Sequence, residues 1–227
     1  MKNLLNLSPR LRALRHSSLL LLAAGLAAGF PAKAAVLIGN LGEPNDTNYS
    51  VNDTGTAASF TVGGSSAVLG GITAKLNNGE IPGFMGDGVV HYHAFVYNDV
   101  ASNPGSSLYD LGSFTYTTPY GTASDVTFNA LTSPTLAANT TYWVVLTVDS
   151  GDYGQWQASL ASKNQTGDPG WTIGDSARFV GNTFAYDSVP LFAVNAAAVP
   201  EPSTWALAGL SLLGMISWRR LGRKQVS

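Results

Sequence analysis

Residues 35 to 197 consist of short β-rich runs separated by glycine, asparagine, aspartate, serine and proline, and this pattern constrains the fold more than any other feature. Several runs alternate in polarity: along 90–97, Tyr92, Ala94 and Val96 fall on one face. Because side chains alternate across a strand, such runs predict strands with two distinct faces. We find no convincing amphipathic helix here. Many short strands without helical crossovers predict an all-β fold, an antiparallel β-sandwich of jelly-roll type.

The strand predicted over 141–148 carries an aromatic residue on each face. Tyr142 shares its face with three aliphatic residues, whereas Trp143 shares its face with Val145 and Thr147. The pattern does not decide between the faces, and we favour the Trp143 face as the buried one because Val145 shares it. The predicted strands are 57–62, 67–76, 89–97, 107–116, 126–130, 140–148, 155–161, 177–180 and 190–194.

The first 34 residues have the three parts of a secretory signal peptide. Basic residues end at Arg15, an apolar run covers 19–30, and Ala32 and Ala34 then form an A-x-A cleavage pattern. The apolar run is shorter than the ~18 residues that a membrane span usually needs. We therefore predict a signal helix that signal peptidase removes after Ala34. A retained membrane helix is the alternative.

Residues 198–227 form a second targeting segment. Pro200, Glu201 and Pro202 precede an apolar run of 14 residues, 205–218. As a helix this run would measure about 21 Å, which is short of the ~30 Å hydrocarbon core. We predict a marginal transmembrane helix with the middle domain facing outward across the inner membrane, because the basic cluster after the helix stays cytoplasmic. This cluster consists of Arg219, Arg220, Arg223 and Lys224.

This tail resembles the PEP-CTERM sorting signal of Gram-negative bacteria over residues 199–227. The Pro-Glu-Pro motif, the apolar run and the basic end occur in that signal's order. The resemblance implies recognition of residues 200–202 by an exosortase, a membrane cysteine protease, in a cell that makes exopolysaccharide. The prolines also keep the backbone extended around Glu201, where a protease can reach it. A plain C-terminal membrane anchor is the alternative.

Three stretches of the middle region resemble a bacterial surface domain called choice-of-anchor R. They are 59–62 with 69–76, 97–99 with 103–108, and 136–146. The resemblance covers most of residues 45–195 and implies a surface domain that different proteins attach through different anchors. Membership of that family does not by itself establish a catalytic activity.

Composition excludes several classes of function. The chain has no cysteine, so it has no disulfide, no thiol nucleophile and no thiol-linked lipid anchor. Residues 35–200 hold three basic and 13 acidic residues, a balance of 3 − 13 = −10, which argues against a nucleic-acid partner. No G-x-S-x-G, H-E-x-x-H or phosphate-loop motif occurs, and Asp149 and Asp152 are only a conceivable carboxylate pair. We therefore predict no enzyme activity and no catalytic residue.

Two kinds of metal site can be imagined. His91 and His93 would point the same way on a strand, and Asp87 could supply a third ligand. The oxygen-rich stretches Glu43–Asp46 and Asp149–Asp152 could hold Ca²⁺, although neither has EF-hand spacing. We favour half-exposed histidines and solvated turns, so the prediction is no metal and no cofactor, with Ca²⁺ left open.

Four aromatic residues near loop-like sequence could form a sugar-binding platform: Tyr120, Tyr153, Trp156 and Trp171. Burial in the core is the alternative that we favour. The sequence as a whole predicts a non-enzymatic exported protein of the cell surface or extracellular matrix, associated with exopolysaccharide or biofilm. It would be processed by signal peptidase and exosortase after transient anchoring in the membrane. A carbohydrate- or calcium-binding module and a secreted hydrolase are the alternatives.

Overall fold

The computed structural model describes residues 34–83, 86–160, 165–178 and 188–198. Ala34–Ala197 forms one compact unit. The predicted signal helix and transmembrane helix lie outside the described residues, as do the Pro-Glu-Pro motif and the basic cluster. Within the described ranges, no helix is long and apolar enough to cross a membrane.

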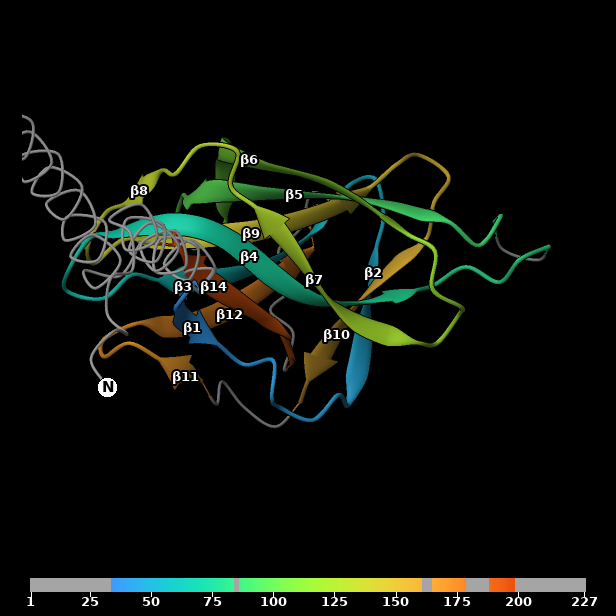
Figure 1. The fold of residues 1–227 in the computed structure, drawn as a ribbon, viewed down its shortest axis with the longest axis horizontal. Helices are drawn as coiled ribbons and strands as arrows, with labels where there is room; N and C mark the ends of the chain where they lie inside the picture. Colours follow the sequence, from blue (N-terminus) through green and yellow to red (C-terminus); the bar gives the residue numbers. More distant parts are fainter. Residues whose placement is uncertain (1–33, 84–85, 161–164, 179–187, 199–227) are drawn as a thin grey trace, which may run out of the picture. The chain divides into compact units, whose positions relative to one another are not determined.

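Two antiparallel sheets build the unit (Figure 1). The first has the order β11-β1-β14-β4-β10-β13, with β2 paired to β10 and with β7 and β8 paired to β4. Its strands are β1 (Val36–Gly39), β2 (Thr47–Val51), β4 (Ala67–Asn78), β7 (Ala123–Asn129), β8 (Thr135–Leu136), β10 (Gly154–Ser159), β11 (Thr166–Gly167), β13 (Val189–Pro190) and β14 (Phe192–Ala196). The second sheet has the order β12-β3-β9-β5-β6. Its strands are β3 (Thr56–Thr61), β5 (Val90–Asp99), β6 (Pro104–Tyr116), β9 (Thr141–Val148) and β12 (Thr172–Arg178).

The chain changes sheet at most of its connections. It moves to the other sheet from β3 to β4, from β4 to β5 and from β6 to β7. Between β5 and β6, which form a hairpin, it stays in the five-stranded sheet. Every strand pairing in the described residues is antiparallel. The predicted fold class, all-β with two antiparallel sheets, is therefore confirmed, and the alternation between sheets is of the jelly-roll kind.

The main hydrophobic core draws residues from both sheets. Tyr92, Ala94 and Val96 are fully buried in it, so the face predicted along β5 is confirmed as the inner one. Phe192 of β14 and Trp156 of β10 enter the same core and lie edge to face, with ring centroids 6.1 Å apart. Edge-to-face packing is a favoured geometry for buried aromatic rings.

Both faces of β9 are buried, so the expected burial of Trp143 is confirmed, but the face that meets the main core is the Tyr142 face rather than the Trp143 face. Tyr142 belongs to the main core together with the three aliphatic residues on its side. Trp143 is also buried, with 2% of its surface exposed, but it lies in a second cluster with Val145, Ala57 and Ala177. The longer uninterrupted apolar row turns inward because it removes more apolar area from water. The second cluster occupies the outer face of the five-stranded sheet.

Candidate functional site

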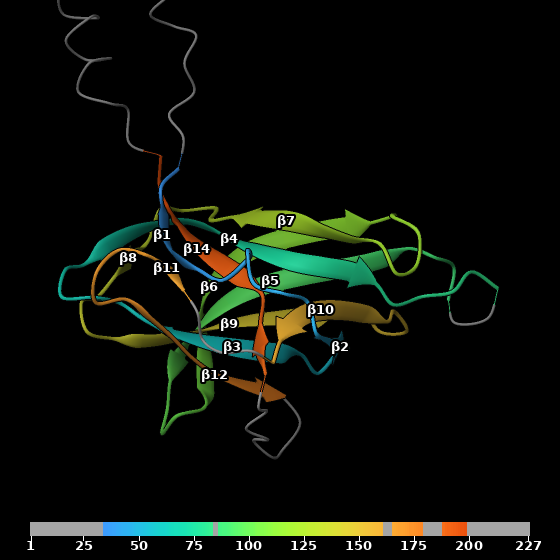
Figure 2. The ribbon, with the colours of Figure 1, turned by 90° about the horizontal axis from the view of Figure 1, so that it is seen from below.

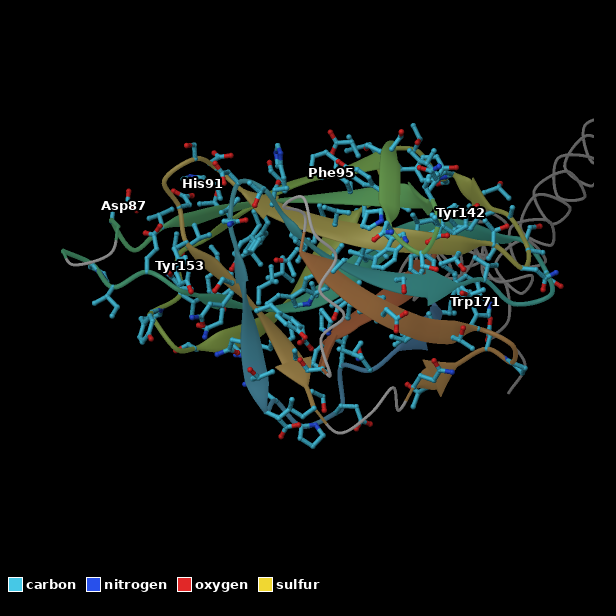
Figure 3. All side chains as sticks on the ribbon, turned by 180° about the vertical axis from the view of Figure 1, so that it is seen from behind. Asp87, His91, Phe95, Tyr142, Tyr153 and Trp171 are labelled. Carbon is cyan, nitrogen blue, oxygen red and sulfur yellow. The ribbon has the colours of Figure 1, made fainter. Side chains whose placement is uncertain are left out.

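The candidate histidine pair lies on the outer face of β5. The Nδ1 atom of His91 is 2.9 Å from the Oδ2 atom of Asp152, and the same oxygen accepts the backbone N–H of His91 at 2.7 Å. Hydrogen bonding to Asp152 is the main cause that raises the pKa of His91, and the charges of Asp149 and Asp87 act in the same direction. Figure 3 shows His91 and Asp87 toward the same end of the domain.

The second histidine of the pair packs against its own strand. The ring of His93 lies edge to face on Phe95, with centroids 5.8 Å apart. Among the described residues, no group of three or more histidine, aspartate or glutamate side chains is placed to hold a metal ion. The geometry therefore gives the metal hypothesis for His91, His93 and Asp87 no further support.

Residues of the two candidate calcium turns make hydrogen bonds within the protein. In the first, Oδ2 of Asp46 accepts hydrogen bonds from Ser159 Oγ at 3.2 Å and from the backbone N–H of Leu160 at 3.1 Å. In the second, the backbone N–H of Asp152 donates to the Asp149 carbonyl oxygen at 3.0 Å, which closes the turn. Both stretches thus have a structural role in the described residues.

The proposed aromatic platform does not form. Trp156 is fully buried and donates its Nε1–H to the Leu191 carbonyl oxygen at 2.9 Å. Trp171 stacks on Phe60 inside the core, with ring planes 9° apart. Tyr153 and Trp171 lie toward opposite ends of the domain in Figure 3. Burial in the core, the interpretation that we favoured, is therefore confirmed for Trp156 and Trp171, and a platform shared by all four rings is excluded.

A cavity on the outer face of the five-stranded sheet was missed by the sequence reasoning. Its volume is about 300 Å³, and Trp143 of β9 and Ala177 of β12 contribute to its lining. The tip of the β5–β6 hairpin supplies another side through Ala101, Ser102 and Asn103. Figure 2 shows the end of this hairpin projecting beside β12.

The hairpin tip has an unusual backbone. Val100 and Asn103 exchange backbone hydrogen bonds of 2.8 and 3.1 Å around the two residues between them. Those residues, Ala101 and Ser102, have φ values of 53° and 61°. Two-residue hairpins of this type favour asparagine and glycine because both central residues need a positive φ. Alanine and serine there carry strain of about 1 kcal/mol or more each.

The opposite wall of the cavity lies at an irregularity of β12. The register between β12 and β3 shifts between Ile173 and Ser176, which is a β-bulge or a related distortion. The Asp175 carbonyl oxygen accepts a 3.1 Å hydrogen bond from Ser59 Oγ, and Ser176 Oγ donates to the Ser188 carbonyl oxygen at 3.0 Å. Such irregularities re-aim side chains and are frequent next to binding sites.

Asp99 connects the hairpin to the cavity floor. Its Oδ1 atom accepts the indole Nε1–H of Trp143 at 2.8 Å, and its Oδ2 atom lies 3.3 Å from the backbone N of Ser102. Charge-assisted hydrogen bonds of this kind are stronger than neutral ones. The carboxylate therefore satisfies the one polar atom of the buried indole and holds the strained turn against it. No motif in the sequence marks Asp99, Asn103 and Asp175 as neighbours.

The comparison with known proteins concerns the tail. The sequence matches the PEP-CTERM protein-sorting motif over residues 198–224, which confirms the predicted sorting signal. No curated protein matches the chain. The motif supports an exported protein that is transiently anchored in the membrane and processed by an exosortase. The resemblance to choice-of-anchor R and the roles of individual tail residues stay predictions.

Proposed function

We propose that this chain, which carries a PEP-CTERM sorting motif, is a non-enzymatic protein of the cell surface or extracellular matrix that associates with exopolysaccharide. The motif at residues 198–224 is the observation that carries the proposal. Strand β14 ends at Ala196, so only Ala197 separates the last strand from the motif. Cleavage within the motif would therefore remove nothing that the described core contains.

The position of β14 supports release of an intact domain. This strand lies between β1 and β4 and pairs antiparallel with both. Phe192 and Val194 are fully buried. The strand next to the tail is hydrogen-bonded to a neighbouring strand on each side, and its side chains pack in the core. Its stability therefore does not depend on a membrane anchor. A domain built in this way suits display before cleavage and persistence after it.

The buried carboxylate of Glu80 is held by backbone hydrogen bonds, which supports a structural role for it and a non-enzymatic role for the protein. Glu80 is 1% exposed, and its two carboxylate oxygens accept backbone N–H bonds from Gly88 and Tyr153, both at 3.0 Å. A buried carboxylate that accepts backbone hydrogen bonds from two loops holds those loops in place. A screen of the purified protein against glycosidase and esterase substrates tests the proposal. Turnover that a single carboxylate substitution abolishes would assign the protein to the hydrolases instead.

Mass spectrometry of the two ends of the mature chain tests the sorting part of the proposal. We expect the chain to begin at Ala35 and, in cells that contain the exosortase, to end within or near residues 200–202. In cells without the exosortase the tail should stay attached and the protein should stay in the membrane fraction. An identical C-terminus in both cell types would show that the tail is an ordinary anchor.

A further inference from the structure

The end of the domain from which the chain continues into the sorting motif carries exposed aliphatic side chains. Val36 of β1 is 47% exposed and Val68 of β4 is 42% exposed. Their neighbours Leu37 and Leu69 are buried, so Val36 and Val68 face outward from the nine-stranded sheet. Leu131, between β7 and β8, is 76% exposed. Exposed apolar residues that gather in one place mark a surface that contacts a partner or a membrane.

Strand pairing brings these three side chains to the same end. Val36 pairs with Asn195 of β14, and the backbone N–H of Ala197, just after β14, donates to the Val68 carbonyl oxygen at 2.9 Å. Leu131 comes two residues after β7, which pairs with the other edge of β4. Figure 2 shows β1, β14 and β4 side by side at this end.

The segments that meet at this end contain no charged residue, although residues 35–200 carry a balance of −10. They are 35–42, 56–74, 126–148 and 188–200. Asp168 lies at the rim, where its backbone N–H donates to the Leu37 carbonyl oxygen at 2.8 Å on the side of β1 away from β14. In Figure 1 β8 lies toward the left end of the domain, whereas Asp87 and His91, labelled in the reversed view of Figure 3, lie toward the other end. An uncharged end can approach lipid without the cost of taking carboxylates out of water.

The chain that follows the domain indicates the partner. The sorting motif begins at residue 198 and implies transient anchoring in the membrane. The predicted apolar run begins at Trp205, so seven residues, 198–204, link it to Ala197. Fully extended, a link of this length spans at most about 25 Å. The aliphatic end of the domain is therefore held within reach of the bilayer surface for as long as the tail is intact.

We infer that the face formed by Val36, Val68 and Leu131 docks on the lipid surface while the protein is anchored. Its aliphatic side chains enter the boundary between headgroups and acyl chains, and the acidic end of the domain stays in water. Three side chains bind a membrane only weakly by themselves, so the contact depends on the tail and is lost when the tail is cut. Docking keeps the sorting motif close to the bilayer, where a membrane protease acts. The inference goes beyond the proposed function and rests on the anchoring that the motif implies.

Single-cysteine labelling tests the inference, because the chain has no cysteine of its own. The full chain is inserted into vesicles of phosphatidylethanolamine and phosphatidylglycerol. A fluorophore is attached at Thr132→Cys, next to Leu131, or at Ser150→Cys, in an exposed turn that adjoins Asp149. Lipids that carry a spin label near the headgroup should quench the fluorophore at residue 132 and not the one at residue 150. A water-soluble quencher should do the reverse.

Two double variants separate docking from simple tethering. Val36→Ser with Val68→Ser removes two apolar contacts without changing the labelled loop, and it should lower the ratio of docked to undocked protein about tenfold. Val100→Ser with Leu108→Ser, comparable changes at exposed positions of the β5–β6 hairpin, should leave that ratio unchanged. Both variants should melt like the wild type, because all four side chains are exposed.

Insertion of the chain without headgroup-level quenching at residue 132 would overturn the docking and leave the anchor standing. Equal quenching in the Val36→Ser, Val68→Ser variant would do the same. A fluorophore shielded from both quenchers would show that a second copy of the chain covers the face, and would also overturn the inference. A chain that does not insert at all would remove the anchor, and with it both the docking and the sorting part of the proposed function.

Discussion

The backbone N–H of Ala196 donates a 2.8 Å hydrogen bond to the carbonyl oxygen of Ala35. The first and last strands of the domain therefore meet at their outer ends, where Val36 also pairs with Asn195. In sequence, this junction adjoins the predicted signal cleavage point on one side and the sorting motif on the other. The two ends of the domain are thus joined by strand pairing directly beside the two predicted processing points.

Removal of β14 should therefore unfold the domain, whereas removal of the tail should not. A chain of residues 35–198 keeps every described strand, while a chain of residues 35–191 loses the buried side chains of Phe192 and Val194. Truncating one buried phenylalanine to alanine costs about 3–5 kcal/mol, and whole domains have only ~5–15 kcal/mol. Thermal melting followed by circular dichroism should show a cooperative transition for the longer chain alone. Equal melting of both would mean that β14 is dispensable.

Trp143→Ala should lower the free energy of unfolding by about 3 kcal/mol, the lower end of the range for a core tryptophan. Its cluster on the outer face is small, and Trp156→Ala, in the main core, should cost more. Trp143→Phe keeps most of the apolar contact but removes the Nε1–H that Asp99 accepts, so it should cost less than Trp143→Ala and the least of the three. Urea denaturation of the three variants measures the order. A larger loss for Trp143→Ala than for Trp156→Ala would contradict the assignment of the faces.

Glu80→Ala should destabilise the domain by about 2–4 kcal/mol, because it leaves the backbone N–H groups of Gly88 and Tyr153 without their acceptors. Glu80→Gln should cost less, since one oxygen remains to accept a hydrogen bond. Asp53→Ala, at an exposed turn position, is the matched control and should change stability by no more than about 0.5 kcal/mol. Denaturation midpoints give the comparison. If Glu80→Ala unfolds like the control, the carboxylate does not support the two loops.

The pair of His91 with Asp152 predicts a pH dependence of defined sign. The pKa of His91 is raised in the folded chain, mainly by its hydrogen bond to Asp152. The pair therefore contributes its full stability below about pH 6.5, the ordinary histidine value, and loses it as pH rises through the raised pKa. NMR titration of the ring should show the pKa of His91 falling toward the ordinary value in Asp152→Asn. Asp125→Asn, on the other sheet, should leave it where it is.

The sequence predicted the fold class and most strands because alternation along runs such as 90–97 and 141–148 is a local property. It predicted β12 only from residue 177, whereas the strand begins at Thr172, since Gly174 and Asp175 at the irregularity interrupt the β-rich pattern. The cavity could not be predicted. Its parts lie about 30 residues or more apart along the chain, and they are brought together by the pairing of β5 with β9 and of β3 with β9 and β12.

The aromatic residues show the same limit for individual side chains. Trp156 and Trp171 lie next to turn-rich sequence, which left a position at the surface open as an alternative, and both enter the core. A strand pattern indicates that two faces exist, but it does not indicate which face meets the other sheet. For Tyr142 and Trp143 that choice depended on how many apolar neighbours each side had, and the longer apolar row proved to be the inner one.

Glu201→Gln tests how the sorting motif is recognised. Glu201 is the only charged residue between Ser188 and Arg219, so its carboxylate is a distinctive feature for a protease to contact. Charge-assisted hydrogen bonds are roughly twice as strong as neutral ones, and glutamine keeps the shape while removing the charge. The variant should be exported normally but stay unprocessed in the membrane fraction.

The control for this substitution is a change at the other end of the tail. Deleting residues 219–224 removes the basic cluster, whose positive charge should orient the apolar run with its C-terminal end in the cytoplasm. That deletion should disturb topology, measured by protease accessibility of the β domain, whereas Glu201→Gln should leave topology as in the wild type and block release alone. Fractionation of cells into membrane and released protein separates the two effects. Release of Glu201→Gln at the wild-type level would show that the exosortase reads the prolines or the apolar run rather than the carboxylate.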